Sequence, residues 1–220
     1  MANRLIIIFA TVFVVNQAYA GWNDSKVYIG AEIGKSRSQM NSGGFNTAGP
    51  HENTNDDRDS EKLFGIKLGL KLDDRWRFDV GYRKYGDQNF VTDSFEPPTP
   101  TFFYDSKIKT KAVIASAYYN IYKNNKLDLY GGAGLGAART KVSTTDFVVE
   151  GSGSDTNLVW QVELGADYSL TESLTVNAGL RYVDLGKTKI DLNNLIGNDA
   201  GDFSADLTSK EVFLGLRYIF

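Results

Sequence analysis

The sequence predicts an all-β fold in which eight antiparallel strands close into an up-and-down barrel. Three observations lead to this prediction. The chain starts with a short apolar leader, several later segments have apolar residues at every second position, and the connections are alternately long and short. The composition agrees, because 220 residues include 22 Gly, 12 Tyr and 13 Phe but only 4 Pro, a balance that favours strands and turns.

The first twenty residues predict a signal peptide that is cleaved after export. Arg4 supplies a basic start, the run from Leu5 to Val15 is almost entirely apolar, and Ala18-Tyr19-Ala20 provides the small residues that a signal peptidase reads. The apolar run covers about eleven residues, whereas a membrane-spanning helix needs about twenty. We therefore expect residues 1–20 to be removed and residues 21–220 to form the barrel domain.

Strand-like alternation is clearest at the C-terminal end. Apolar or aromatic side chains occupy every second position from Val212 to Phe220, and successive side chains of a strand point to opposite faces. The same pattern recurs in five upstream segments, which begin at Val27, Phe64, Trp76, Leu158 and Leu174. Segments at about 106–122 and 127–139 complete eight strands. The faces of 106–122 cannot be assigned, because the stretch around 113–119 is nearly all apolar.

The apolar face is expected to point outward, toward lipid. The other face carries most of the glycines and charges of both signs at mid-strand depth, which suits a crowded, narrow lumen. Aromatic residues gather near the segment ends on the apolar face, as an interfacial girdle requires. They are Trp76, Tyr82, Tyr168, Tyr182, Tyr218 and Phe220.

The connections support a membrane barrel. Short connections are expected at 73–74, 123–126 and 171–173, and long polar ones at about 39–60, 87–105, 140–156 and 187–207. Strict alternation of the two kinds is typical of outer-membrane barrels, which have short periplasmic turns and long extracellular loops. An immunoglobulin-like sandwich is not expected to sort its loops in this way.

With these features the chain resembles the small eight-stranded outer-membrane barrel superfamily, which includes the transmembrane domain of outer membrane protein A, the opacity proteins and Neisserial surface protein A. The resemblance covers the whole mature chain. Its most specific element is the ending Val212-Phe-Leu-Gly-Leu-Arg-Tyr-Ile-Phe220, and Gly179-Leu-Arg-Tyr-Val-Asp-Leu-Gly186 is similar to the penultimate strand of opacity-type proteins.

The resemblance implies a location in the outer membrane of a Gram-negative cell. It also implies that Leu216, Tyr218 and Phe220 form the signal that the barrel assembly machinery reads. The expected partners are therefore this machinery and the outer-membrane lipid, including lipopolysaccharide. We expect a monomer.

Eleven charged residues on the mixed face are expected to form a lumen network. Buried, unpaired charge is very costly, so these side chains should pair with one another. Eight strands leave an interior barely wide enough for side chains, which favours a plug of salt bridges. The alternative is a path for small solutes or ions, with Arg77 or Arg181 as the gate. The set is Glu32, Lys67, Lys71, Arg77, Asp79, Arg83, Glu163, Asp167, Arg181, Glu211 and Arg217.

Several motifs are weak indications of chemistry. Gly132-Ala-Gly-Leu-Gly-Ala137 fits a dinucleotide-binding fingerprint, but that fingerprint needs a helix directly afterwards and residues 139–145 predict a strand or loop. Small residues on a narrow barrel wall explain the motif better. The absence of cysteine excludes disulfides and thiolate sites, and a net charge of -3 disfavours nucleic-acid binding. No cofactor is expected.

An enzyme is not expected either. His51 is the only histidine, and neither Ser42 nor Ser60 forms with it a recognisable catalytic set. An enzyme acting on outer-leaflet lipid would lose its activity on His51→Ala. The acidic stretches at 56–61 and 191–202 lack the glycine and the terminal glutamate of a calcium-binding loop, so we expect solvated loops and no metal site.

The loop at 87–105 contains a candidate binding patch. Three prolines at 97–100 stiffen this loop, and aromatic residues flank them. The aromatics either form a binding surface or pack onto the barrel rim. They are Phe95, Phe102, Phe103 and Tyr104. The sequence thus favours a structural or adhesive surface protein that presents four long loops to a host or extracellular ligand, with a narrow channel as the alternative.

Overall fold

The computed structural model describes residues 25–46, 58–94, 102–145, 149–194 and 199–220. The predicted signal peptide, His51 and Phe95 lie outside these ranges, so those predictions stay open. No helix within the described ranges is long and apolar enough to cross a membrane.

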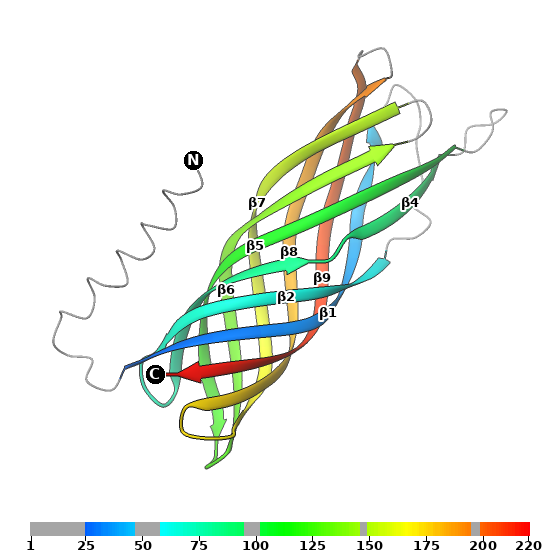
Figure 1. Ribbon diagram of the computed structural model, residues 1–220. Coiled ribbons are helices and arrows are strands. Elements are labelled where there is room, and N and C mark those ends of the chain that lie inside the picture. The colour runs from blue at the N-terminus through cyan, green and yellow to red at the C-terminus, as the bar shows by residue number, and fades with distance from the viewer. Residues whose placement is uncertain (1–24, 47–57, 95–101, 146–148, 195–198) are drawn as a thin grey trace.

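The described residues form nine strand segments that stand side by side in one antiparallel sheet (Figure 1). Their bounds are β1 Lys26–Asn46, β2 Arg58–Lys71, β3 Trp76–Tyr85, β4 Gln88–Ser94, β5 Phe102–Lys123, β6 Leu127–Thr145, β7 Val149–Ser169, β8 Leu174–Asn194 and β9 Asp199–Ile219.

The sheet closes on itself because β3 and β4 both pair with β5. β3 pairs with residues 111–119 of β5, and β4 pairs with residues 102–108, so the two segments are consecutive parts of one barrel strand. The interruption lies at Gly86, whose N–H donates to the Lys62 carbonyl at 2.8 Å. Nine segments therefore make eight barrel strands, which confirms the predicted eight-stranded up-and-down barrel.

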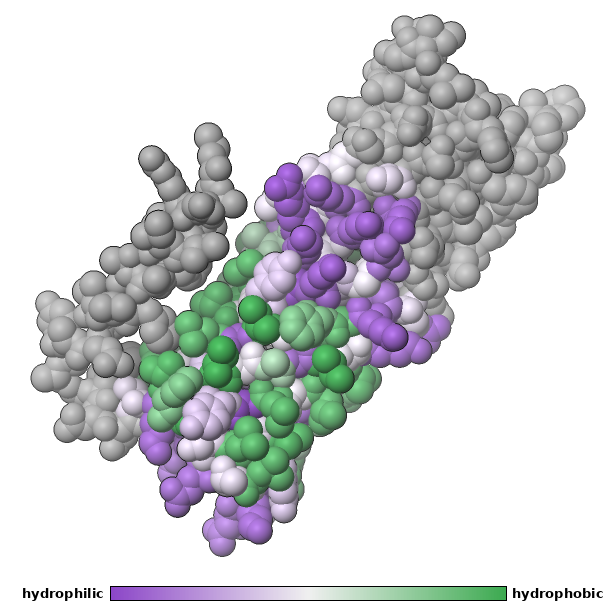
Figure 2. Space-filling model, viewed as in Figure 1, coloured by the Kyte–Doolittle hydropathy of each residue, from purple (hydrophilic) through white to green (hydrophobic). Residues whose placement is uncertain are grey.

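The apolar face points outward, as predicted. Ile33, Leu158 and Leu180 are 62%, 75% and 62% exposed, although each is a large aliphatic residue. Figure 2 shows the resulting hydrophobic belt in green across the lower part of the barrel, on the face in view. Charged residues at adjacent positions of the same strands are buried inside. Such an arrangement suits a barrel surrounded by lipid, because water is in contact with neither its apolar outside nor most of its inside.

Aromatic side chains mark both edges of this belt. Trp76 and Tyr119 pack together at the end with the short turns, with ring centroids 5.0 Å apart. At the opposite edge, Trp160 lies 5.5 Å from Tyr182 and donates its indole N–H to Asp184 at 3.1 Å. Rings with one polar end suit the boundary between lipid and water.

The structure assigns the faces of the segment 106–122, which the sequence left open. Even-numbered residues from Ile108 to Asn120 are buried, and Val113 and Ile121 are exposed. The inward residues change from apolar Ile108 and Ile114 to polar Asn120 along the strand. Hydropathy did not separate the faces here because both faces are apolar around position 114.

The predicted bounds of the long loops are wrong. All eight barrel strands continue well past the apolar belt into the segments 39–60, 87–105, 140–156 and 187–207. Residues 39–46 of β1 pair with β9, for example, and β4 pairs with β5 as far as Ser94 and Phe102. In these segments the regular apolar alternation is lost from the sequence, while the backbone hydrogen bonds between the strands continue.

The short connections lie at the opposite end of the barrel, together with the C-terminus (Figure 1). In the turn between β2 and β3, the Asp73 carboxylate accepts the backbone N–H groups of Arg75 and Trp76 at 2.7 and 2.6 Å. These two hydrogen bonds hold the pKa of Asp73 below its usual value. A carboxylate that bonds its own turn in this way fixes a tight connection.

Candidate functional site

The barrel interior is the site that the sequence singles out, and Arg181 of β8 lies at its centre. Its guanidinium donates from Nε to Glu163 Oε2 at 2.7 Å and from Nη1 to Glu211 Oε2 at 2.8 Å. Nη1 and Nη2 also donate to the two carboxylate oxygens of Glu32 at 3.0 and 3.1 Å. Arg181 thus binds three carboxylates from three other strands, β1, β7 and β9.

Two more cations complete this cluster. Arg83 Nε lies 3.2 Å from Glu32 Oε1, and Arg83 Nη1 lies 3.7 Å from Glu211 Oε2. Lys67 Nζ lies 3.0 Å from Glu32 Oε2. Three cations therefore face three carboxylates in a layer that crosses the lumen, and the charges balance.

A second layer lies closer to the short turns. Asp167 accepts from Arg77 at 3.0 Å and from Arg217 at 2.7 Å. Asp79 in the same region accepts the hydroxyl of Tyr28 at 2.9 Å. The structure thus places ten of the eleven predicted lumen charges in paired or hydrogen-bonded positions inside the barrel.

Lys71 is the exception. Its side chain is 33% exposed and contacts Asp74 of the adjacent turn at 3.4 Å, so it lies at the rim and outside the network. The alternation placed Lys71 on the inward face correctly, but the strand ends at this residue and the flexible side chain reaches the turn instead.

The network also depends on tyrosines that sequence reasoning missed. Tyr85 donates its hydroxyl to Glu211 at 2.7 Å, and Tyr130 donates to Glu163 at 2.9 Å. The Arg77 guanidinium lies 4.0 Å from the ring centroid of Tyr130. The alternation could have identified both tyrosines as inward-facing, because Tyr85 follows the inward Arg83 by two positions and Tyr130 precedes the inward Gly132 by two.

Inward glycines make room for inward rings on the neighbouring strand. Gly165 stands directly opposite Tyr130, and Gly179 stands directly opposite Phe213. A Cβ at Gly165 would lie 2.5 Å from the Tyr130 ring, and one at Gly179 would lie 2.7 Å from the Phe213 ring. The glycine motif at 132–137 has the same setting, since it lies within β6 and its even-numbered residues face the lumen.

An apolar layer that the sequence did not predict lies above the charged network, on the side of the long connections. Ten side chains from seven of the eight barrel strands form it, and each is at most 3% exposed. They are Leu63, Tyr85, Ile108, Ala112, Ile114, Ala138, Val159, Val183, Leu185 and Leu207. A hollow of about 90 Å³ at the short-turn end is lined by Arg77, Asp167 and Arg217 of the second charged layer, among others.

This arrangement suits a structural role for the interior. Charge pairs, hydrogen-bonded hydroxyls and the apolar layer follow one another along the lumen and tie opposite walls together. Within the described ranges, no group of three or more His, Cys, Asp or Glu side chains is placed to hold a metal ion.

The other predicted residues lie outside the interior. Leu216, Tyr218 and Phe220 all face outward, and the Phe220 N–H donates to the Val27 carbonyl at 2.9 Å, which joins the last residue to β1. Residues 102–104 of the predicted loop patch belong to β5 and pair with β4, so their backbone is strand and not loop. Phe95 lies outside the described residues.

Comparisons with known proteins agree with the barrel fold. The family model for the outer membrane protein beta-barrel domain matches residues 5–220. Outer membrane protein PagN of Salmonella typhimurium is 25% identical over 165 residues, which cover 71% of this chain and 67% of that protein.

Two solved structures share the fold. The outer membrane protein OprG from Pseudomonas aeruginosa gives a TM-score of 0.57 at 18% identity, with 89% of this chain and 96% of OprG covered. Neisserial surface protein A gives a TM-score of 0.54 at 18% identity, with 88% of this chain and 97% of the other covered.

Proposed function

Because the chain belongs to the outer membrane protein beta-barrel domain family, we propose that it is a surface protein whose barrel acts as a rigid, closed support for extracellular binding. In this proposal the polar upper wall and its loops bind a ligand outside the cell, on a host surface or in the extracellular matrix. The barrel interior stabilises that support and takes no part in binding.

The observation that carries the proposal is the height of the wall above the apolar belt. On β5 the last outward apolar residue below the cations is Val113, yet the strand begins at Phe102. Those additional eleven residues correspond to roughly 36 Å along the strand, at about 3.3 Å per residue. Crossing a membrane takes only about ten residues. A hydrogen-bonded wall of this length is unnecessary for anchoring, but it would hold a binding surface away from the membrane.

The filled interior also supports a role on the outside. A channel needs a continuous polar path, whereas here an apolar layer from seven strands lies across the lumen above the charge network. A small antiparallel barrel without a path can still present long connections, and loops on a rigid scaffold commonly carry binding residues.

The test shortens the wall one hairpin at a time without breaking the strand register. Phe90 and Ser106 are direct partners, so residues 91–105 can be replaced by the two-residue turn Asn-Gly, which suits hairpins. Equivalent cuts use the partner pairs Gln39 and Arg58, Lys141 and Ser154, and Lys187 and Asp206.

Cells that display each trimmed barrel are compared with cells that display the full chain for attachment to cultured cells and to matrix proteins. Removal of the binding hairpin should lower attachment by about tenfold or more, the loss expected when 1.4 kcal/mol or more of binding free energy disappears. A gel shift between heated and unheated samples verifies that each variant is folded. If all four trimmed barrels attach as well as the full chain, the proposal is wrong.

A further inference from the structure

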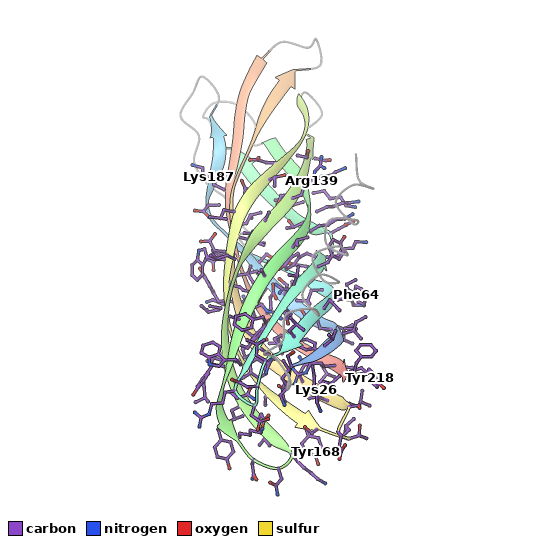
Figure 3. The ribbon with its side chains drawn as sticks, turned by 90° about the vertical axis from the view of Figure 1, so that its left-hand side faces the viewer. Lys26, Phe64, Arg139, Tyr168, Lys187 and Tyr218 are labelled. Atoms are coloured by element: carbon purple, nitrogen blue, oxygen red, sulfur yellow. The ribbon has the colours of Figure 1, made fainter. Side chains whose placement is uncertain are left out.

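The outward face of the barrel changes abruptly at the extracellular edge of the apolar belt. On six adjacent barrel strands, the first outward residue above the apolar run is a lysine or an arginine, and all six are exposed. We call this set the cationic collar, and its members are Lys35, Lys62, Lys84, Lys111, Arg139 and Lys210. Figure 2 shows purple, hydrophilic residues directly above the green belt, and Figure 3 places Arg139 farther from the short turns than Phe64.

Within the collar, residues of like charge are direct cross-strand partners. Lys35 is the direct cross-strand partner of Lys62, and Lys111 is the direct partner of both Lys84 and Arg139. Just above the collar, Arg37 pairs with Lys210 and Lys109 with Lys141. Like charges directly opposite each other destabilise a sheet. Among the described residues, no carboxylate lies within ion-pair distance of the six collar cations.

Other cations on the outer surface of the barrel lie next to carboxylates. Between β8 and β9, Lys187 stands directly opposite Asp206, and below it the outward Asp184 takes the place of a collar cation on β8. Slightly above the collar, Asp87 lies 2.8 Å from Lys107 and 3.7 Å from Lys109. The collar thus differs from the other charged surface in lacking anions of its own.

A groove joins the collar to the apolar belt. Its volume is about 990 Å³, and Lys35, Lys62 and Lys84 line it together with the outward Ile33, Phe64 and Val212. The buried Leu63, Tyr85 and Phe213 add to its apolar lining. A ligand that fills this groove must therefore offer both anionic groups and apolar chains. The anionic groups of this ligand must lie on the extracellular side of its apolar chains, because the cations of the groove lie on the extracellular side and its apolar residues on the membrane side.

We infer that the cationic collar binds the phosphate groups of a lipid A-type glycolipid in the outer leaflet, while its acyl chains lie against Ile33, Phe64 and Val212. Phosphate oxygens accept charge-assisted hydrogen bonds from lysine and arginine, and their negative charge removes the repulsion between opposed cations. The collar stands at the depth of the headgroups, because it follows the apolar belt directly. A soluble polyanion would satisfy the lysines but would leave the apolar lining of the groove unused.

The sharpest test uses one substitution that should raise the unfolding temperature in one kind of vesicle and lower it in another. In vesicles of phosphatidylcholine alone, Lys111→Gln relieves repulsion from Lys84 and Arg139, so the unfolding midpoint should rise by about 2 °C. In vesicles that also contain lipid A with both phosphates, the same change removes a phosphate contact and the midpoint should fall. Lys187→Gln is the matched control, because its cross-strand partner is Asp206 and its effect should keep one sign in both vesicles. If Lys111→Gln shifts the midpoint in the same direction in both vesicles, the inference is wrong.

A binding measurement identifies the ligand. The full chain, purified in detergent, is titrated with lipid A, and native mass spectrometry counts the bound molecules. Glutamine at positions 35, 62, 84 and 111 together should weaken binding by about tenfold or more. A control with glutamine at positions 26, 71, 123 and 126 removes the same charge at the short-turn rim and should bind as the unchanged chain does.

Two further ligands distinguish the source of the anion. Lipid A without phosphates should bind at least about tenfold more weakly than the phosphorylated form. Equal binding of the two forms would overturn the inference, as would equal losses in the collar and control variants. A soluble sulfated polysaccharide that binds through the collar and resists displacement by phosphorylated lipid A would instead identify the collar as a polysaccharide site, and would also overturn it.

Discussion

Arg181 and Glu32 meet inside the lumen and form two parallel hydrogen bonds of 3.0 and 3.1 Å, although 149 residues separate them in the chain. This bidentate geometry suits a planar guanidinium and a carboxylate. Since Arg181 also binds Glu163 and Glu211, it links four barrel strands through a single side chain. The pair therefore ties the first strand of the barrel to its penultimate one.

Replacement of Arg181 should destabilise the barrel strongly. Arg181→Met would leave Glu32, Glu163 and Glu211 with less cationic compensation in a buried site, and breaking such a pair typically costs about 3–5 kcal/mol. Arg181→Lys should also be impaired, because an ammonium cannot reproduce the forked contacts. Urea unfolding in vesicles, followed by the gel shift, measures the change. Arg75→Gln at an exposed turn is the control, and equal stability of the two variants would contradict the central role of Arg181.

Gly165→Ala should destabilise the barrel by about 1–3 kcal/mol through overpacking. The added Cβ would lie 2.5 Å from the Tyr130 ring and 2.8 Å from the Ala178 carbonyl oxygen. Gly81→Ala is a matched control on an inward position, because its Cβ would have no neighbour closer than 3.7 Å. The same unfolding measurement compares the two. A Gly165→Ala barrel as stable as Gly81→Ala would mean that Tyr130 moves aside freely.

The purified barrel should be electrically silent in a planar lipid bilayer. The charge network and the apolar layer fill the lumen, so neither small solutes nor ions have a continuous polar path through the described interior. Single-channel recording checks this, after the gel shift has verified folding. Steady conductance steps that change on Arg77→Gln or Arg181→Gln would instead favour the narrow channel.

Phe220→Ala should lower assembly in cells while leaving refolding into lipid vesicles nearly unchanged. The Phe220 side chain is 71% exposed and its ring contacts Tyr218 with centroids 5.2 Å apart, so little packing is lost. Because the ring faces lipid, its loss should cost about 1–2 kcal/mol of transfer free energy in vesicles, which is too little to prevent refolding. The amount of folded protein in isolated outer membranes measures assembly. Phe220→Tyr retains a terminal aromatic residue and should assemble normally, and an equal loss of refolding in vitro would assign Phe220 a structural role instead.

Much of the fold followed from local pattern. The alternation at Val212–Phe220 and at Trp76–Tyr82 predicted which residues face outward, because the period of a strand fixes the faces once the strand is identified. The same pattern placed Glu163, Arg181 and Glu211 on one inward face. It did not separate the two faces around Ile114, where both are apolar. It also gave no sign of the wall above the belt, where the outward face is no longer apolar.

The sequence by itself therefore determined the eight strands, the outward apolar face and the set of charges enclosed in the lumen, since each depends on the spacing of neighbouring residues within one strand. Only the tertiary structure decided that Arg181 binds Glu32, that Gly165 receives the Tyr130 ring, that an apolar layer lies above the charges, and that Lys111 stands between Lys84 and Arg139. These relationships join different strands. They depend on the register between strands and on the closure of the barrel, neither of which the hydropathy of a single segment determines.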